Sequence, residues 1–406
     1  MTLARTLPQA ASDGSAVQTL DQLLHHALEQ LASDIHVESG EDYFRVRIRI
    51  DGQLQIAATP ALSLRDSVVS RLKVLARMDI AEKRVPQDGR IQYAYKGQIV
   101  DLRVSSLPTL HGEKIVVRIL NFSRTRPALA TLGYEQDDCT KLIQSLKRPH
   151  GLILMTGPTG AGKTLSLYCC LELLNQTEVN ISTVEDPSEI HLPGANQVNI
   201  NERAGLTFAT ALRALLRQDP DIIMIGEIRD LETAEIAIQA AQTGHLVLST
   251  LHTNDAPSTL ARLHHMGVSS FNVAASVSLI TAQRLIRRLC EQCKDVMTDD
   301  QAESTLSALH PQDIQYMAEH SSTGNKLYKA VGCANCDKGY KGRVGIYQVM
   351  PISDAMQALI LRDHDTQALA AQAATEGIRT LRQAGWLKVL SGVTSVDEVM
   401  SLTTHG

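Results

Sequence analysis

A glycine-rich loop constrains the fold of this chain more than any other feature of its sequence. The loop reads Gly157-Pro158-Thr159-Gly160-Ala161-Gly162-Lys163-Thr164. It follows an apolar run at residues 152–155 and precedes a segment at residues 165–174 that is typical of a helix. A strand, a G-x-x-x-x-G-K-S/T loop and a helix in this order form a phosphate-binding P-loop. Its glycines let backbone N–H groups surround phosphate oxygens, and the helix start adds partial positive charge.

The loop predicts a nucleotide site in which two side chains have definite roles. We expect Lys163 to hold the β- and γ-phosphates of ATP and the Thr164 hydroxyl to ligate Mg²⁺. Hydrolysis also needs carboxylates near the γ-phosphate. Glu185 and Glu189 follow an expected strand at 181–184, and Glu227 follows another at 222–225. The carboxyl ends of parallel strands converge on a ligand, so these acids are candidates for catalysis. The alternative for Glu185 or Glu189 alone is a solvated loop charge.

Two or three domains are expected, because 406 residues exceed one hydrophobic core. Apolar strands at 152–155, 181–184, 222–225 and 246–249 alternate with helices, which predicts an α/β domain with a parallel sheet over 132–406. Residues 340–406 are expected to be helical. Before it, residues 16–120 read as a small α+β domain, with helices near 17–31 and 64–78 and hairpin turns at Asp51-Gly52 and Lys96-Gly97. Residues 1–15 form a predicted flexible tail, and 121–131 a predicted linker.

Composition and charge argue against some classes of function. The net charge is −5 and aromatic residues make up 3%, which argues against phosphate tracks and stacking platforms for nucleic acid. The N-terminus shows no charged-then-apolar signal, and no apolar run approaches the ~18–20 residues that span a bilayer. We therefore expect a cytoplasmic protein that inserts no segment into a membrane and meets one only through a partner.

Four cysteines form two knuckles within an insert at residues 290–340. Their spacing is Cys290-x-x-Cys293 and Cys333-x-x-Cys336, and four thiolates suit tetrahedral structural Zn²⁺. Residues 294–332 are a longer interval than compact zinc ribbons use, so a small subdomain must bring the knuckles together. Unpaired reduced cysteines or a redox pair are the alternatives.

The chain closely resembles the secretion ATPases of type II secretion and type IV pilus assembly. The resemblance extends from Ala32 nearly to the C-terminus. It rests on the segments ASDIHVE, VRIRIDG, LARMDIAEKRVPQDGRI, GPTGAGKT, ISTVEDPSEI, LRALLRQDPDIIMIGEIRDLETAEIA, TGHLVLSTLHTNDA and GYKGRVGIYQVMP. It implies a RecA-like P-loop ATPase domain preceded by a small PAS-like domain, with a zinc-binding insert and a helical C-terminus.

The resemblance also assigns roles to acidic residues and histidines. Glu185, Asp186 and Glu189 fall in the family's Asp box, and Glu227 falls in its atypical Walker B motif, where it would organise Mg²⁺ and water. His245 and His252 match the family's His box. Satisfied structural histidines are the alternative for both.

Four arginines match positions that contact nucleotide in the family as the N-terminal domain closes. Arg90 and Arg103 lie in the small domain, whereas Arg213 and Arg217 are four residues apart and are expected on one helix face. A solvated surface charge is the alternative for any one of them. The row of Arg45, Arg47 and Arg49 fits either an intersubunit face or plain solubility.

By resemblance, the chain is a motor that uses ATP, Mg²⁺ and Zn²⁺. It would form a homo-oligomer, expected as a hexameric ring, and turn an inner-membrane platform protein to add pilin or pseudopilin subunits. The four cysteines are typical of assembly rather than retraction ATPases. A slow regulatory subunit and a nucleic-acid motor are the competing interpretations.

About thirty residues precede the SDIHVE motif, so the family's further N-terminal docking domain is not expected here. Ala161 and Leu165-Ser166 depart from the family's usual residues without removing the backbone donors.

Overall fold

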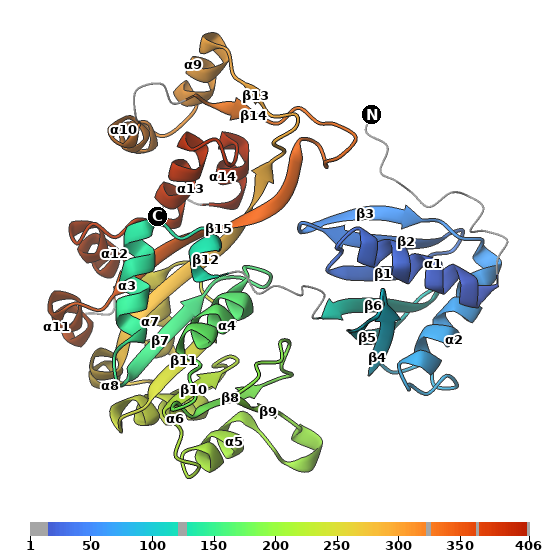
Figure 1. Cartoon of the computed structure of the whole chain (residues 1–406), viewed down its shortest axis with the longest axis horizontal. Helices are drawn as coiled ribbons and strands as arrows, with labels where there is room; N and C mark the ends of the chain where they lie inside the picture. The colour runs from blue at the N-terminus through green and yellow to red at the C-terminus, as the bar shows by residue number, and fades with distance from the viewer. Residues whose placement is uncertain (1–14, 121–127, 322–325, 363–364, 404–406) are drawn as a thin grey trace. The chain divides into compact units, whose positions relative to one another are not determined.

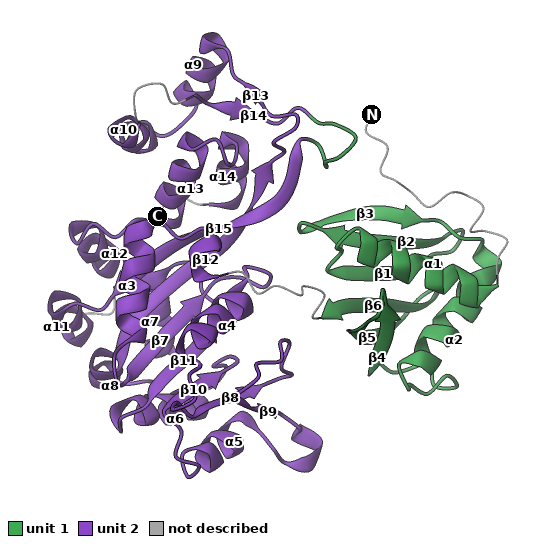
Figure 2. Cartoon of the chain, viewed as in Figure 1, with its two compact units in different colours: residues 1–125, 332–338 green, residues 126–331, 339–406 purple. Residues whose placement is uncertain are grey.

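The computed structural model describes residues 15–120, 128–321, 326–362 and 365–403. It divides into two compact units, residues 1–125 with Gly332–Lys338, and residues 126–331 with 339–406 (Figure 2). The predicted tail at 1–15 lies almost entirely outside the described residues, as does most of the predicted linker. No helix within the described ranges is both long and apolar enough to cross a bilayer.

The first unit is a six-stranded antiparallel sheet with two helices on one face (Figure 1). Its elements are α1 (Ala16–Glu29), β1 (Asp34–Ser39), β2 (Phe44–Ile50), β3 (Gln53–Ala58), α2 (Arg65–Leu75), β4 (Gln87–Tyr95), β5 (Gln98–Thr109) and β6 (Gly112–Leu120). The strand order is β3-β2-β1-β6-β5-β4. Both predicted hairpin turns are present, each with two consecutive residues at positive φ, as a type I′ turn requires. Apolar side chains from one face of the sheet, such as Phe44 and Val104, pack with Leu24 of α1 and Leu72 of α2.

The other face of this sheet carries the arginines predicted on β2. Arg45 and Arg47 donate to Glu38 of β1 at 2.8 and 2.7 Å, and Arg118 of β6 donates to Asp34 at 3.0 Å. Burial alone would raise the pKa of Glu38, but hydrogen bonds from Arg47 and Arg45 lower it to about 2. These arginines are therefore engaged within the unit by carboxylates of the neighbouring strand.

The second unit contains a seven-stranded sheet of order β15-β12-β7-β11-β10-β8-β9. All neighbouring pairs are parallel except β12 with β15. Its elements as far as β12 are α3 (Gln136–Leu146), β7 (Gly151–Thr156), α4 (Lys163–Leu174), β8 (Ile181–Glu185), β9 (Asn196–Asn199), α5 (Phe208–Leu215), β10 (Ile222–Ile225), α6 (Leu231–Gln242), β11 (Leu246–Leu251), α7 (Ala256–His265), α8 (Ser270–Ser276) and β12 (Val277–Leu289). The four predicted apolar strands are confirmed, and they are buried on both faces as a helix-covered parallel sheet requires.

The prediction that residues 340–406 are entirely helical is wrong at its start. The elements after β12 are β13 (Asp295–Val296), α9 (Asp299–Ser307), α10 (Pro311–His320), β14 (Tyr328–Lys329), β15 (Tyr340–Pro351), α11 (Asp354–Arg362), α12 (Thr366–Thr375), α13 (Leu381–Leu390) and α14 (Val396–Leu402). Two glycines and several β-branched or aromatic residues in β15 disfavour a helix. The strand pairs along almost its whole length with β12. The C-terminus after β15 is helical, as predicted.

The insert between β12 and β15 is anchored on the C-terminal helices by a buried polar cluster. Asp313 of α10 accepts hydrogen bonds from Arg382 at 2.9 Å and from the Trp386 indole at 2.8 Å, both on α13. Trp386 is fully buried, and Arg382 is 5% exposed. The insert therefore packs on α13 through an ion pair that has little access to water.

Candidate nucleotide site

The phosphate loop, residues 157–164, connects the buried strand β7 with the helix α4. Gly162 caps this helix with a φ of 87°, a left-handed conformation that favours glycine, and α4 starts at Lys163. Gln283 of β12 donates to the carbonyl of Ala161 at 2.8 Å. The predicted strand, loop and helix are thus present in order, and the loop is held from the side by β12.

Lys163 lies across the loop that precedes it. Its ammonium donates to the carbonyls of Gly157 at 2.7 Å and Pro158 at 3.2 Å, and the residue is 8% exposed. Burial lowers the pKa of Lys163 to about 8, although the nearby Glu227 carboxylate acts in the opposite direction. The lysine is therefore desolvated and adjacent to one of the predicted catalytic acids.

Glu227 and His252 meet after the ends of two neighbouring parallel strands. Glu227 follows β10 and His252 follows β11, and His252 Nε2 lies 3.4 Å from Glu227 Oε2. Arg229 contacts the other carboxylate oxygen at 2.5 Å. Burial would raise the pKa of Glu227, but the Arg229 hydrogen bond and charge, together with His252, lower it. The expected convergence of strand ends therefore places an ionised carboxylate and a histidine together.

The turn that carries His252 is fixed to the strand that leads into the phosphate loop. Thr156, the last residue of β7, accepts a hydrogen bond from the backbone N–H of Thr253 at 3.0 Å. The hydroxyls of these two threonines are 2.5 Å apart, and Thr253 also contacts Thr259 at 2.7 Å. These bonds set the position of His252 relative to the end of β7.

Glu185 is placed differently from Glu227: it is the last residue of β8, whereas Glu227 comes after the end of β10. It is 3% exposed and accepts hydrogen bonds from Tyr168 at 2.8 Å and Thr183 at 2.7 Å. Burial raises its pKa. The carboxylate is thus occupied by side chains of its own unit. Asp186 follows it 4.0 Å from Arg229, and Glu189 lies in the segment between β8 and β9.

The structure does not bring His245 to the phosphate loop of its own chain. Leu246, the next residue, pairs with Gly151 at the start of β7, whereas the loop follows the end of that strand. A six-residue strand is about 20 Å long. His245 contacts the carbonyl of Ala240 at 3.0 Å. His245 and His252 therefore lie at opposite ends of β11, and His252 is the one that follows the strand end near Glu227.

The four predicted arginines fall into two pairs. Arg213 is on α5 and pairs with Glu232 at 2.8 Å, but α5 ends at Leu215, so Arg217 does not share its helical face as expected. Arg217 instead donates to the carbonyl of Arg213 at 2.7 Å. Arg90 and Arg103 occupy directly opposed positions on β4 and β5 of the first unit.

Three side chains contribute to this region without having been predicted. Arg229 follows Glu227 by two residues, and this short spacing in the sequence indicates a possible ion pair between them. Tyr168, on the phosphate-loop helix, holds Glu185, and Gln283 supports the loop itself. Gln283 belongs to a strand that the apolar pattern did not reveal, so its position gave no signal.

The four predicted metal ligands form one cluster. The sulfur atoms of Cys290, Cys293, Cys333 and Cys336 all lie within 4.8 Å of one another. Pairing of β12 with β15 ends at Leu289 and Tyr340, and β13 pairs with β14, so the knuckles lie at the ends of paired strands. This strand pairing explains how the two cysteine knuckles come together although residues 294–332 separate them. Cys333 and Cys336 sulfurs are 3.6 Å apart, close to the ~3.8 Å edge of a tetrahedron with Zn–S bonds of about 2.3 Å.

Comparisons with known proteins show what the chain is similar to. A family model described as type II/IV secretion system protein matches residues 9–401. The chain is 52% identical over 390 residues to the type IV pilus assembly ATPase PilB of Acinetobacter baylyi, covering 96% of this chain and 66% of that protein. It is 44% identical over 410 residues to the type II secretion system ATPase E of Vibrio cholerae, covering 99% of this chain and 79% of that protein. The chain thus spans about two thirds of the length of the pilus relative.

Solved structures show the same fold. The pilus retraction motor PilT with bound ADP superimposes with a TM-score of 0.64 at 25% identity, covering 95% of this chain and 96% of that one. The ATPase DotB of Legionella pneumophila gives a TM-score of 0.68 at 19% identity and covers 96% of both chains.

Proposed function

The chain belongs to the type II/IV secretion system protein family, and we propose that it is an ATP-hydrolysing motor that assembles a type IV pilus or a type II secretion pseudopilus. The observation that carries this proposal is the meeting of Glu227 with His252 beside the desolvated Lys163 of the phosphate loop. Identity to a named pilus assembly ATPase is about twice that to the retraction motor, which supports assembly over retraction.

The residues of the phosphate loop fit Mg²⁺–ATP. The loop N–H groups and Lys163 would bind the phosphates, and the Thr164 hydroxyl would ligate Mg²⁺, which neutralises phosphate charge when bound. Glu227 is ionised and would accept a hydrogen bond from the attacking water. His252, which contacts the same carboxylate, would hold Glu227 in place and respond to the γ-phosphate. Arg229 occupies one Glu227 oxygen, so its release would accompany water positioning.

Arg90 and Arg103 would supply positive charge from the first unit to the nucleotide phosphates. Like charges on directly opposed residues of neighbouring strands are destabilising. Arg118 of β6 lies directly opposite Arg103 on the other side of β5, and it forms an ion pair with Asp34. The described residues provide no such ion pair for Arg90 or Arg103, which supports an anionic ligand for this pair. Arg213 and Arg217 of the second unit would also supply positive charge to the nucleotide, once Arg213 leaves Glu232.

We propose that the four cysteines hold structural Zn²⁺. Their sulfur atoms all lie within 4.8 Å of one another, which supports a tetrahedral thiolate site, and no disulfide joins them in the part of the chain that the structure describes. Bound zinc would fix the two knuckles together and so hold the insert in register with β12 and β15.

We further propose a hexameric ring on the cytoplasmic side of the inner membrane, bound to a platform protein of the pilus or secretion machine. The names of the relatives, which refer to pilus assembly and to type II secretion, support this setting. ATP would favour one arrangement of the ring and hydrolysis would release it, because a ligand shifts a conformational equilibrium by its differential affinity.

Two substitutions test the motor. Lys163→Ala should abolish both ATP hydrolysis and filament assembly in cells that lack the chromosomal copy. Glu227→Gln should lower kcat by about 10²- to 10⁴-fold while leaving ATP binding measurable, since it removes the charge that orients water. Lys147→Ala, at an exposed position after α3, is the matched control and should behave as wild type. Wild-type assembly by the Lys163→Ala protein would refute the motor.

A further inference from the structure

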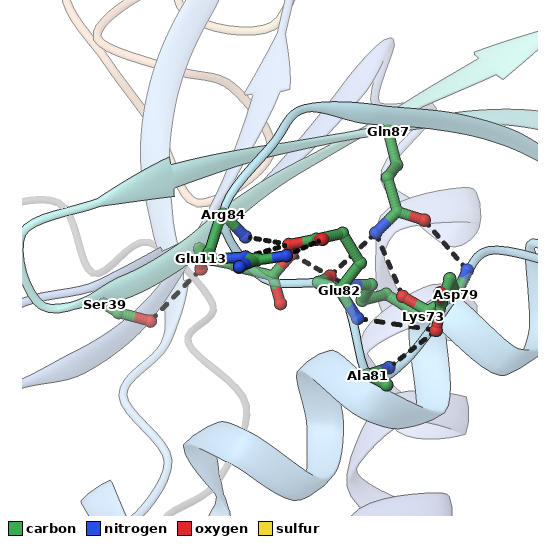
Figure 3. A network of polar contacts seen from close by, with 8 residues as sticks. All are labelled: Ser39, Lys73, Asp79, Ala81, Glu82, Arg84, Gln87 and Glu113. Carbon is green, nitrogen blue, oxygen red and sulfur yellow. Dashed lines mark hydrogen bonds and ion pairs between the residues drawn. The ribbon is translucent and has the colours of Figure 1, made fainter.

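A polar network that is buried at Lys73 and Glu113 holds the segment between α2 and β4 in the first unit (Figure 3). We call this segment, residues 79–87, the strap. Most of its residues are exposed, including the apolar side chains of Ile80 and Val85 at 48% and 51%. An exposed segment of this kind gains little from hydrophobic burial. Its conformation therefore depends on the polar contacts that tie it to α2, β4 and β6.

Lys73 provides the most buried of these contacts. Its side chain is 1% exposed, and its ammonium donates to Glu113 of β6 at 2.9 Å and to the carbonyl of Glu82 in the strap at 2.6 Å. A buried ammonium needs such partners because its desolvation is costly. The lysine thus joins a helix, a strand and the strap at one point.

Gln87 closes the strap at its other end, where β4 begins. Its amide oxygen accepts from the backbone N–H of Asp79 at 2.8 Å, and its amide nitrogen donates to the carbonyls of Asp79 at 3.0 Å and Glu82 at 2.9 Å. Asp79 in turn accepts from the N–H of Ala81 at 2.8 Å. Three hydrogen bonds from one side chain therefore fix both the start and the middle of the strap to the first residue of β4.

Close packing fixes β4 two residues further on. A Cβ added to Gly89 would lie 2.2 Å from the carbonyl oxygen of Ala76, just after α2. Only glycine allows this approach. Because β4 is an edge strand, hydrogen bonds to β5 hold one side of it only. The contacts of Gln87 and Gly89 supply the restraint that a second neighbouring strand gives elsewhere.

Arg90 follows directly, and it is exposed and directly opposite Arg103. Repulsion between the two guanidinium groups acts to push the edge strand away from β5. The strap network and the Gly89 contact resist that displacement.

We infer that Gln87 and Lys73 are positioning residues that hold the backbone of Arg90, so that its guanidinium is preorganised for nucleotide phosphate. This inference rests on the proposed function, in which Arg90 contacts nucleotide. The alternative is that the network stabilises the fold without acting through Arg90. The two differ in whether the effect of a strap substitution requires Arg90.

A double-mutant cycle on the full-length protein separates them. Gln87→Ala removes three hydrogen bonds and leaves no buried charge, and we expect it to lower kcat about 5- to 10-fold, as a small displacement of a charged group from its ideal place does. Arg90→Ala should lower kcat further. Adding Gln87→Ala to Arg90→Ala should then change kcat by less than about twofold, because the positioned group is gone.

Two further variants keep the test decisive. Arg84→Ala is the matched control, because Arg84 is 87% exposed and, among the described residues, forms its ion pair with the nearby Glu82; its kcat should match wild type. Lys73→Met combined with Glu113→Leu removes the ion pair without burying an unpaired charge. This pair should reproduce the kcat loss of Gln87→Ala in protein that remains folded by circular dichroism.

The outcomes distinguish the inference from the function on which it rests. Unchanged hydrolysis in Arg90→Ala would show that the proposed role of Arg90 is wrong. Two other outcomes, both with a large effect of Arg90→Ala, would refute the positioning role alone. In one, Gln87→Ala lowers kcat by the same factor whether or not Arg90 is present. In the other, the Gln87→Ala protein keeps the kcat of the wild type.

Discussion

The unusual pKa of Lys163 predicts how nucleotide affinity depends on pH. Burial lowers this pKa from 10.5 to about 8. Phosphate charge favours the ammonium, so nucleotide should return the pKa to at least its ordinary value. Below pH 8 the lysine is already charged and affinity should be flat. Above pH 8 a proton must be taken up on binding, so affinity should fall as pH rises.

The size of the effect follows from the two pKa values. At pH 9 about nine tenths of the free protein carries neutral Lys163, whereas the bound lysine stays charged. The dissociation constant should therefore rise about tenfold between pH 7 and pH 9, or ~1.4 kcal/mol. Binding at pH 9 should also take up about 0.9 protons per nucleotide.

Isothermal titration with a non-hydrolysable ATP analogue measures both quantities. Titrations in two buffers of different ionisation enthalpy, at fixed ionic strength and Mg²⁺, give the proton uptake. Lys163→Arg is the control, because its guanidinium stays charged throughout and its weaker binding should not vary with pH. A dissociation constant that is the same at pH 7 and pH 9 in the wild type would refute the reasoning, as would an equal slope in the arginine variant.

Two more predictions concern the insert. Purified protein should contain about one zinc per chain by elemental analysis, and Cys333→Ser should reduce it below half an equivalent, since a structural site needs four ligands; a zinc-free wild type would contradict the site. Asp313→Ala should destabilise the helical C-terminal part by about 3–5 kcal/mol, because it leaves Arg382 buried without its carboxylate. Urea unfolding followed by Trp386 fluorescence measures this loss, and a change under 1 kcal/mol would show that water reaches the guanidinium.

The sequence predicted the elements whose signals are local. The phosphate loop has a fixed spacing, the four central strands are short apolar runs, and both hairpin turns have residues that accept positive φ. The topology of a parallel sheet predicted the place of Glu227 without knowledge of any side-chain contact, whereas His252 was predicted from the family resemblance. The cysteine cluster followed from the chemistry of its ligands.

What the sequence did not reveal depends on contacts between distant residues. The apolar pattern of β15 also suits a buried helix, and only its pairing with β12 decides between them. His245 and His252 flank the same strand, and sequence proximity hid the fact that they lie at opposite ends of it. The Lys73 network joins residues 73, 82, 87 and 113, for which no local pattern exists.

The strand β12 gives the phosphate loop and the cysteine cluster a common support. Gln283, near its middle, holds the loop, and Cys290 follows its last residue. Between them, Arg287 is clamped by the buried Glu398 of α14 at 2.6 Å, and the pairing with β15 is unbroken as far as Arg287. An extended, hydrogen-bonded strand transmits a shift along its axis instead of absorbing it. The phosphate loop and the Arg287 ion pair are therefore joined by one continuous strand, and the register shift between Arg287 and Leu289 separates that strand from the cysteine cluster.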